Sequence, residues 1–142
     1  MSQLSSRSID RGLLLIRVAL GLVFVMHGWQ KLTVFGLAGT AGFLGGLGVP
    51  LPSVNAVLLI AVELAGGALL AAGAGTRVVG VLLAFAMSVA TVAAHGAAGF
   101  FLPTGYEFAL TLALLSLAIA LTGAGRYSVD ATIAARGLRA TA

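Results

Sequence analysis

The sequence predicts an all-α membrane protein built as a bundle of four transmembrane helices. Sixty per cent of its 142 residues are hydrophobic and only 8% are charged, whereas about a quarter of the residues in a typical soluble domain are charged. The apolar residues gather in four stretches, each close to the roughly 17–25 residues that a helix needs to cross a membrane. Helices are expected because every backbone polar group must be satisfied within the lipid.

The four spans follow one another with short connections, at residues 12–30, 54–74, 78–95 and 106–123. They predict one transmembrane domain over residues 12–125, with an N-terminal tail (1–11) and a C-terminal tail (126–142). The polar start of the chain is similar to the beginning of a signal peptide. The apolar stretch that follows is too long for one and no small-residue cleavage site comes after it, so a retained first span is expected.

Arginine placement predicts the orientation of the bundle. The N-terminal tail, the connection between the second and third spans and the C-terminal tail carry six arginines: Arg7, Arg11, Arg77, Arg126, Arg136 and Arg139. The opposite side carries only Lys31. Because loops rich in lysine and arginine stay in the cytoplasm, both termini are expected to be cytoplasmic.

Two short helices are expected outside the spans. The first outer loop has no charge between Lys31 and Glu63, so it predicts a short helix at the membrane interface, ended by the glycines and prolines of residues 45–52. Together with the apolar outer loop at residues 99–103, it is either a lid over the bundle or simply an interfacial loop. Beyond residue 125, Ser128 predicts the cap of a short amphipathic cytoplasmic helix. A surface pair between Arg126 and Asp130 is expected there.

Ionisable residues within the apolar stretches mark the candidate site, because such groups are costly in lipid and usually face the bundle interior. They are Arg17, His27, Lys31, Glu63, His95 and Glu107. Helical spacing places Arg17 and Lys31 on one face of the first span, together with small residues. Depth predicts an architectural Arg17–Glu63 pair and an outer cluster of the remaining four groups. In the third and fourth spans, two stripes are also expected to face inward: Ala84, Ser88, Thr91 and His95, and Glu107, Thr111 and Ala118.

A quinone is the favoured ligand of the outer cluster, because it needs an apolar slot, donors for its carbonyl oxygens and a proton route. The candidate catalytic residues are His27, Lys31, His95 and Glu107. The candidate cofactor-binding residues are His27, Trp29, Lys31, Glu63 and His95. Histidine exchanges protons near neutral pH, and a lysine stabilises developing negative charge on oxygen.

Other interpretations of the same residues stay open. Two histidines at similar depth also fit axial ligation of a b-type haem, which is less favoured because the first and third spans can lie diagonally. No metal site is expected, since there is no cysteine and no third ligand at zinc spacing. The charged pairs can also serve only to fix helix register.

Several short motifs, taken in order, resemble the DoxX family of small four-helix membrane proteins, which is related to the DoxD-type subunits of thiosulfate:quinone oxidoreductase. The motifs are Arg-Val-Ala-Leu-Gly (17–21), His-Gly-Trp-Gln-Lys-Leu (27–32), Gly-Val-Pro (48–50), Glu-Leu-Ala-Gly-Gly (63–67), Gly-Thr-Arg (75–77), Glu107 and Gly-Ala-Gly-Arg-Tyr-Ser-Val-Asp (123–130). The resemblance covers about residues 10–131. It implies a four-span fold in a bacterial cytoplasmic (inner) membrane.

Three functions are compatible with the resemblance and the residues. The first is a subunit or anchor of a quinone-linked redox system that acts on sulfur compounds or in oxidative stress. The second is a non-enzymatic scaffold that docks soluble cytoplasmic redox enzymes, and the third is a small proton-coupled transporter. The expected partners are the lipid bilayer, soluble redox enzymes and further copies of the chain. Nucleic acid is not expected, because the basic excess lies near the membrane.

Overall fold

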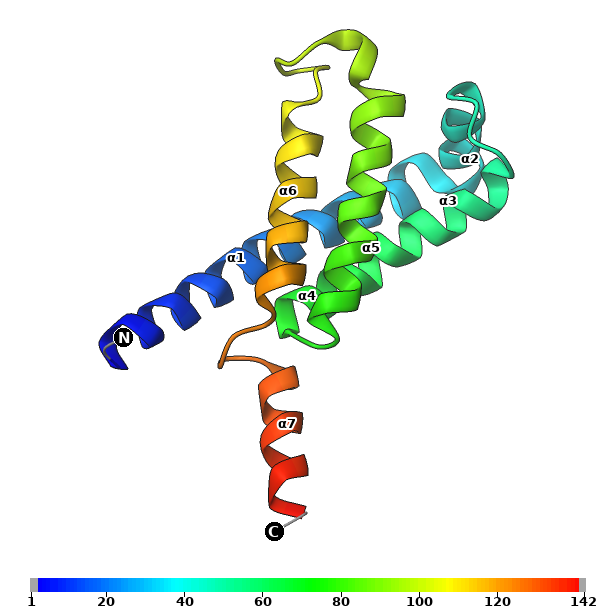
Figure 1. The fold of residues 1–142 in the computed structure, drawn as a ribbon. Helices are drawn as coiled ribbons and strands as arrows, with labels where there is room; N and C mark the ends of the chain where they lie inside the picture. Colours follow the sequence, from blue (N-terminus) through cyan, green and yellow to red (C-terminus); the bar gives the residue numbers. More distant parts are fainter. Residues whose placement is uncertain (1–2, 141–142) are drawn as a thin grey trace.

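The computed structural model describes residues 3–140, and every regular element among them is helical, which confirms the all-α prediction (Figure 1). The first half of the chain forms a hairpin. Its ascending arm is α1 (Gln3–Gln30), which continues through the π-helical segment η1 (Lys31–Phe35) into α2 (Gly36–Gly46). Its returning arm consists of α3 (Pro52–Ala61), the π-helical segment η2 (Val62–Gly66) and α4 (Gly67–Ala72).

The second half forms another hairpin that packs across the first (Figure 1). Its arms are α5 (Thr76–Val89), extended by the π-helical segment η3 (Ala90–Ala94), and α6 (Glu107–Thr122), with a short 3₁₀ turn η4 (Gly96–Ala98) between them. The last helix, α7 (Val129–Ala140), points away from the bundle.

Both predicted short helices are present. The helix in the first outer loop is α2, which ends at Gly46 within the glycine- and proline-rich segment. The terminal helix is α7, and the Ser128 hydroxyl accepts the backbone N–H of Ala131 at 3.1 Å, as a capping residue does. The first helix, by contrast, begins at Gln3, inside the segment that was expected to be a polar tail.

Among the described residues, two continuous helices are long and apolar enough to cross a membrane, Pro52–Ala72 and Thr76–Ala94. The helix α6 is apolar but has only 16 residues, which corresponds to about 24 Å at 1.5 Å per residue. The hydrocarbon core of a bilayer is about 30 Å thick. The four-span arrangement and the orientation of the termini therefore stay predictions.

Large apolar side chains cover the outer faces of the helices. Examples that are more than 60% exposed come from α1, α5 and α6: Leu15, Leu22, Val78, Phe85 and Leu121. Extended apolar surfaces of this kind are unusual on soluble monomers and mark contact with a membrane or a partner. The interior is correspondingly small and centres on Leu20, Phe24, Leu70, Leu83 and Ile119.

Glycines allow the two arms of the first hairpin to touch through their backbones. A Cβ atom on Gly67 would lie 2.8 Å from the carbonyl oxygen of Gly21, and one on Gly28 would lie 2.9 Å from the backbone nitrogen of Leu64. Gly80 in α5 similarly faces the carbonyl oxygen of Ser116 in α6. These glycines thus serve close helix contacts within one chain, and they fix which residues of α1 lie opposite which residues of η2 and α4.

Of the two predicted inward-facing stripes, the one in α5 is confirmed in part, because Ala84 is buried and Thr91 and His95 are half-buried. The one in α6 is wrong, because Thr111 and Ala118 are exposed. Ser88 and Thr111 are exposed, and each hydroxyl donates to the carbonyl oxygen four residues earlier, at 2.8 and 2.7 Å. A serine or threonine that bonds to its own helix needs no interior partner, so its position does not mark the buried face. The buried faces carry Leu83, Ala84 and Met87 in α5, and Leu112, Ser116 and Ile119 in α6.

Candidate functional site

The centre of the candidate site is an ion pair between Lys31 and Glu63. The Lys31 ammonium donates a hydrogen bond to Glu63 Oε1 at 2.9 Å and lies 2.8 Å from Oε2. The Glu63 side chain is 1% exposed and that of Lys31 is 21% exposed. The contact at Gly28 explains the pairing, because it places the last turn of α1 beside Leu64 and so brings Glu63 level with Lys31.

The predicted pair between Arg17 and Glu63 is therefore wrong. Arg17 lies 14 residues before Lys31 on a continuous helix, which is about 21 Å along its axis. Its guanidinium is fully buried at the opposite end of the hairpin and donates to the carbonyl oxygen of Tyr127 at 2.6 Å. Gly73 makes room for it, since a Cβ atom there would overlap the guanidinium.

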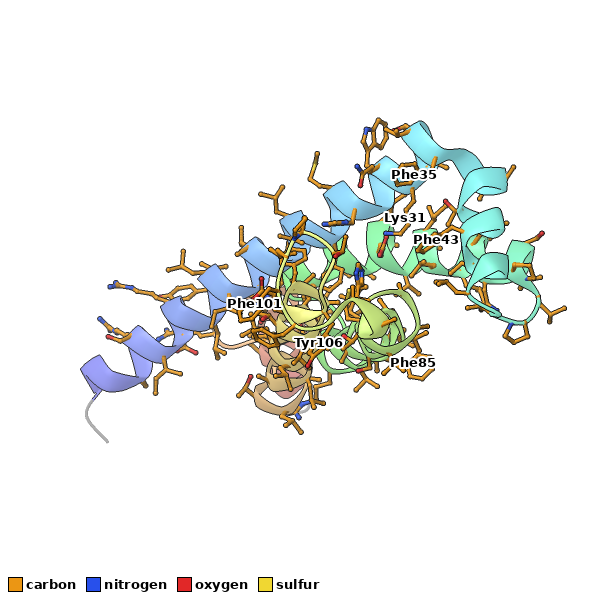
Figure 2. The ribbon with its side chains drawn as sticks, turned by 90° about the horizontal axis from the view of Figure 1, so that it is seen from above. Lys31, Phe35, Phe43, Phe85, Phe101 and Tyr106 are labelled. Carbon is orange, nitrogen blue, oxygen red and sulfur yellow. The ribbon has the colours of Figure 1, made fainter. Side chains whose placement is uncertain are left out.

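A cavity of about 540 Å³ opens beside the ion pair. Lys31 and Glu63 form its charged part, and its other walls are mostly apolar side chains from both hairpins, for example Phe24, Leu59, Met87 and Leu112. Viewed from above, Lys31 and Phe43 point into the interior space beside the end of α1, whereas Phe85 lies at the periphery of α5 (Figure 2). The site thus combines one charged pair with a large apolar volume.

Both histidines of the predicted outer cluster line this cavity. The ring of His27 packs 5.9 Å from the ring of Phe108, measured between centroids. His95 Nδ1 lies 2.9 Å from the carbonyl oxygen of Thr104. That contact ties the end of η3 to the outer loop, and it leaves Nε2 as the ring nitrogen without this bond. The structure therefore brings His27, Lys31, Glu63 and His95 to one cavity.

The other two predicted site residues lie elsewhere. Glu107 is not a wall residue. Its Oε1 accepts the backbone N–H of Leu102 at 2.8 Å, which positions the outer loop whose Leu102 and Pro103 do face the cavity. Trp29 is 55% exposed and is absent from the cavity walls, since it lies on the outer face of α1.

Both apolar outer segments contribute to the cavity. Phe43, Leu44 and Leu47 come from α2 and the turn after it, and Leu102 and Pro103 come from the loop before α6. These segments were expected either to form a lid or to be ordinary interfacial loops. Their side chains form part of the wall around the candidate ligand space.

Each of the three π-helical segments carries wall residues of the cavity. Lys31 belongs to η1, Glu63 to η2, and Ala90 and Ala94 to η3. Short π-helical turns interrupt regular helix geometry and occur often at functional sites. Local composition does not predict these turns, because they depend on how the surrounding helices pack.

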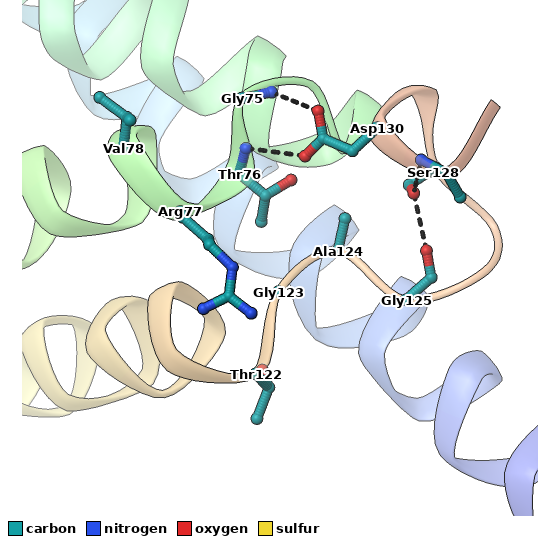
Figure 3. A pocket seen from close by; sticks show the side chains of 11 residues that line it. Gly75, Thr76, Arg77, Val78, Thr122, Gly123, Ala124, Gly125, Ser128 and Asp130 are labelled. Carbon is teal, nitrogen blue, oxygen red and sulfur yellow. Dashed lines mark hydrogen bonds between the residues drawn. The ribbon is translucent and has the colours of Figure 1, made fainter. Parts of the chain in front are cut away.

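A second cavity, of about 500 Å³, lies at the other end of the bundle (Figure 3). Asp130 lines this cavity, and its carboxylate accepts hydrogen bonds from the backbone N–H groups of Gly75 at 2.7 Å and Thr76 at 3.0 Å. It thereby caps the start of α5 from another part of the chain. Partial burial raises the pKa of Asp130, but the hydrogen bonds from Thr76 and Gly75 and the charge of Arg17 outweigh this and lower it.

The predicted surface pair between Arg126 and Asp130 is consequently wrong, because the Asp130 carboxylate is engaged by the start of α5. The backbone N–H of Arg126 donates instead to Asp10 at 3.0 Å. Arg77 donates to the carbonyl oxygens of Ala120 and Leu121 at the end of α6. The charged groups around the second cavity thus hold helix ends together, and we assign them a structural role.

The fold and the site define a class of protein: a small helical bundle with apolar outer faces and a buried ion pair beside a largely apolar cavity. The chain belongs to the DoxX family, whose model matches residues 12–96. No solved structure shows a significant match to it.

Curated relatives cover most of the chain. It is 38% identical over 125 residues to the protein named "Putative oxidoreductase CatD" of Bacillus subtilis, covering 88% of this chain and 89% of that protein. It is 30% identical to inner membrane protein YphA of Escherichia coli (83% and 87% covered) and 32% identical to inner membrane protein YqjF of the same species (85% and 91% covered).

Proposed function

We propose that the protein is a bacterial inner-membrane subunit of a quinone-linked redox system and that its larger cavity binds the quinone. The observation that carries this proposal is the Lys31–Glu63 ion pair, which forms the charged part of an otherwise largely apolar cavity of about 540 Å³. The relative named as an oxidoreductase and the two relatives named as inner membrane proteins support it.

The residues fit an uncharged ligand that carries carbonyl oxygens. Lys31 and Glu63 cancel one another's charge, so the cavity offers no net charge to attract an ion. An ammonium has three N–H donors, and the pair with Glu63 leaves donors for a ligand oxygen. Apolar walls suit the ring and alkyl parts of such a ligand, as in most small-molecule sites.

Proton exchange can be assigned to residues on the same cavity. A bound quinone supplies the capacity to take up two electrons and two protons. His27 and His95 both line the cavity and carry ring nitrogens able to exchange protons. Glu63 lines the same cavity, and Lys31 holds its carboxylate in place.

A titration of the purified protein in mild detergent tests this function. A short-chain quinone is added and binding is followed by calorimetry, after organic extraction has shown whether a quinone copurifies. We expect saturable binding that weakens at least tenfold in Lys31→Met, Glu63→Gln and His27→Ala. The outward-facing variant Leu22→Ala, 61% exposed in the native chain, is expected to bind like the native protein. Absence of saturable binding in the native protein contradicts the proposal.

A scaffold for soluble redox enzymes is the second candidate, favoured by the projection of α7 from the bundle (Figure 1). Removal of the chain after residue 132 tests it, because this truncation keeps Asp130 and the cap of α5. If α7 docks soluble enzymes, their recovery with the tagged protein falls upon truncation while the melting temperature is maintained. Equal recovery from the full and truncated chains excludes α7 as the docking element.

A further inference from the structure

We infer that the ligand enters the larger cavity sideways from the lipid, between α3 and α5, and that it is an amphiphile whose long apolar tail stays in this opening. This inference rests on the proposed function, because it concerns the same cavity. It adds the route by which the ligand enters and the apolar tail that the ligand carries.

The opening follows from how the two hairpins pack. The start of α5 lies against the end of the first hairpin, where η2 and α4 contact it, and its remaining length packs on α6. The helix α3 packs on α2 and not along α5. Figure 1 shows the returning arm of the first hairpin, which ends in α4, and α5 diverging from the turn that joins α4 to α5, so that α3 lies apart from the outer part of α5. The cavity lies in this divergence, since both helices contribute walls to it.

The rim of the opening is apolar and exposed at the same time. Leu58 of α3 is 54% exposed, Leu82 of α5 is 48% exposed and Phe85 of α5 is 69% exposed, yet all three line the cavity. No charged residue occurs in α3, and α5 has none after Arg77. An exposed apolar rim is unfavourable against water but continuous with the acyl chains of a bilayer.

The depth of the rim agrees with entry from hydrocarbon. Leu82 and Phe85 lie near the middle of the apolar stretch Thr76–Ala94, and Leu58 lies within the stretch Pro52–Ala72. At about 1.5 Å per residue, each is several ångströms inside the end of its helix. Toward the outer end, Phe43, Leu47 and Leu102 add apolar side chains to the cavity wall. The opening therefore lies at the level of the hydrocarbon in which an apolar ligand dissolves.

The two ends of the cavity define the ligand class. The inner end offers the donors of Lys31 and a net neutral charge, which suits a carbonyl-bearing ring. The rim offers only aliphatic and aromatic surface, which suits an unbranched or isoprenoid tail. A tailed quinone satisfies both ends, whereas a small water-soluble quinone satisfies only the inner end.

Single cysteines in this naturally cysteine-free chain provide the test. Leu82→Cys and, as the matched control, Val81→Cys are reconstituted into liposomes and labelled with a bulky maleimide. Val81 neighbours Leu82 on α5, is 55% exposed and does not line the cavity. We expect the label at residue 82 to slow association of a decyl-tailed quinone at least tenfold and the label at residue 81 to leave it unchanged. Phe85→Cys serves as a second rim position should Leu82→Cys fail to fold.

The outcomes separate the two proposals. Equal association rates for both labelled proteins, with saturable binding intact, overturn lateral entry and leave the proposed function standing. Equal affinities for tailed and tailless quinones overturn the assignment of a tail site. Absence of quinone binding to the unlabelled proteins overturns both.

Discussion

Two cations on one helix face have different partners. Arg17 and Lys31 share the buried face of α1, but Arg17 donates to the carbonyl oxygen of Tyr127 while Lys31 pairs with a carboxylate. The planar guanidinium, with five donors, suits fixed backbone oxygens. The ammonium of Lys31 is a compact point charge that balances Glu63 and retains donors toward the cavity. Position along the helix, rather than charge, therefore separates an architectural residue from a candidate binding residue.

The coupling between Lys31 and Glu63 can be measured with a double-mutant cycle. Removal of one partner leaves a buried, uncompensated charge, so Lys31→Met and Glu63→Gln are each expected to lower the free energy of unfolding by about 3 kcal/mol. The double variant is expected to lose less than the sum of the two, by about 1 kcal/mol or more. Denaturant unfolding in mild detergent measures all four proteins. Strict additivity would show that the two residues act independently.

The cap formed by Asp130 gives a prediction with a pH dependence. Asp130→Asn is expected to lower the free energy of unfolding by about 1 kcal/mol near neutral pH, a typical value for a lost cap. Because the pKa of Asp130 is lowered in the folded protein, its contribution is complete above the unfolded value of about 3.9. It is lost as the pH falls through the lowered folded value.

Melting temperatures of the native protein and Asp130→Asn, measured from pH 7 to pH 3, check this dependence. The difference between the two proteins is expected to be constant above pH 5 and to shrink at the acid end. Groups common to both proteins cancel in the comparison. A difference that grows on acidification contradicts the assigned cap.

At the scale of elements, contacts between helices decide what local sequence leaves open. Gly21 and Gly67 set the register of the first hairpin, and that register selects Lys31 as the partner of Glu63. The π-helical turns at η1, η2 and η3 then place their side chains at the cavity. The hydroxyl groups of Ser88 in α5 and Thr111 in α6 do not mark the buried faces of these helices, since each donates to a carbonyl oxygen of its own helix.

Gly67→Ala tests the contact that sets the register. The added methyl group would lie within 3 Å of the carbonyl oxygen of Gly21 and of the backbone nitrogen of Val25, so the helices must separate. We expect a loss of about 1–3 kcal/mol in the free energy of unfolding. Gly42→Ala is the matched control, because a Cβ atom there meets nothing within 4 Å, and it should stabilise slightly. Equal effects at the two positions would rule out a close contact at Gly67.

At the scale of the whole molecule, the arrangement of the chain agrees with the charge asymmetry. The turn between α4 and α5, the end of α6 and the start of α7 lie together, held by Asp130 and Arg77. Arg126 lies in the same region. The outer loops lie at the other end of the helices (Figure 1), and Lys31 starts the segment η1 that leads into α2 there. We propose that the first end faces the cytoplasm, with four spans in residues 12–125.

Cysteine labelling checks this orientation. In the cysteine-free chain, Ala97→Cys and Ala134→Cys place single thiols at exposed positions near opposite ends. A membrane-impermeant maleimide applied to spheroplasts is expected to label residue 97 at once and residue 134 only after permeabilisation. A cysteine added before Met1 should behave like residue 134. Immediate labelling of residue 134 would contradict four spans with cytoplasmic termini.

The sequence by itself determined the all-helical class, the positions of the second, third and fourth main helices within a few residues, the two short helices and the buried face of α1. It placed the start of the first helix nine residues too late, at residue 12 rather than Gln3. The properties that it determined correctly follow from local periodicity and apolar composition, which neighbouring residues encode directly. It also identified four of the residues that share the cavity: His27, Lys31, Glu63 and His95. The assembly of His27, Lys31 and His95 at one site could be expected because they lie toward the same ends of their helices. Glu63 lies near the middle of its span and was assigned to Arg17 instead.

Only the tertiary structure decided that Glu63 pairs with Lys31 rather than Arg17, that Asp130 caps α5, and that Glu107 and Trp29 lie off the cavity. Each of these depends on the register and rotation of one helix against another. In this protein those variables are fixed by backbone contacts at a few glycines. A shift of one helical turn, about 5.4 Å, would move Glu63 out of reach of Lys31 while leaving every local pattern unchanged.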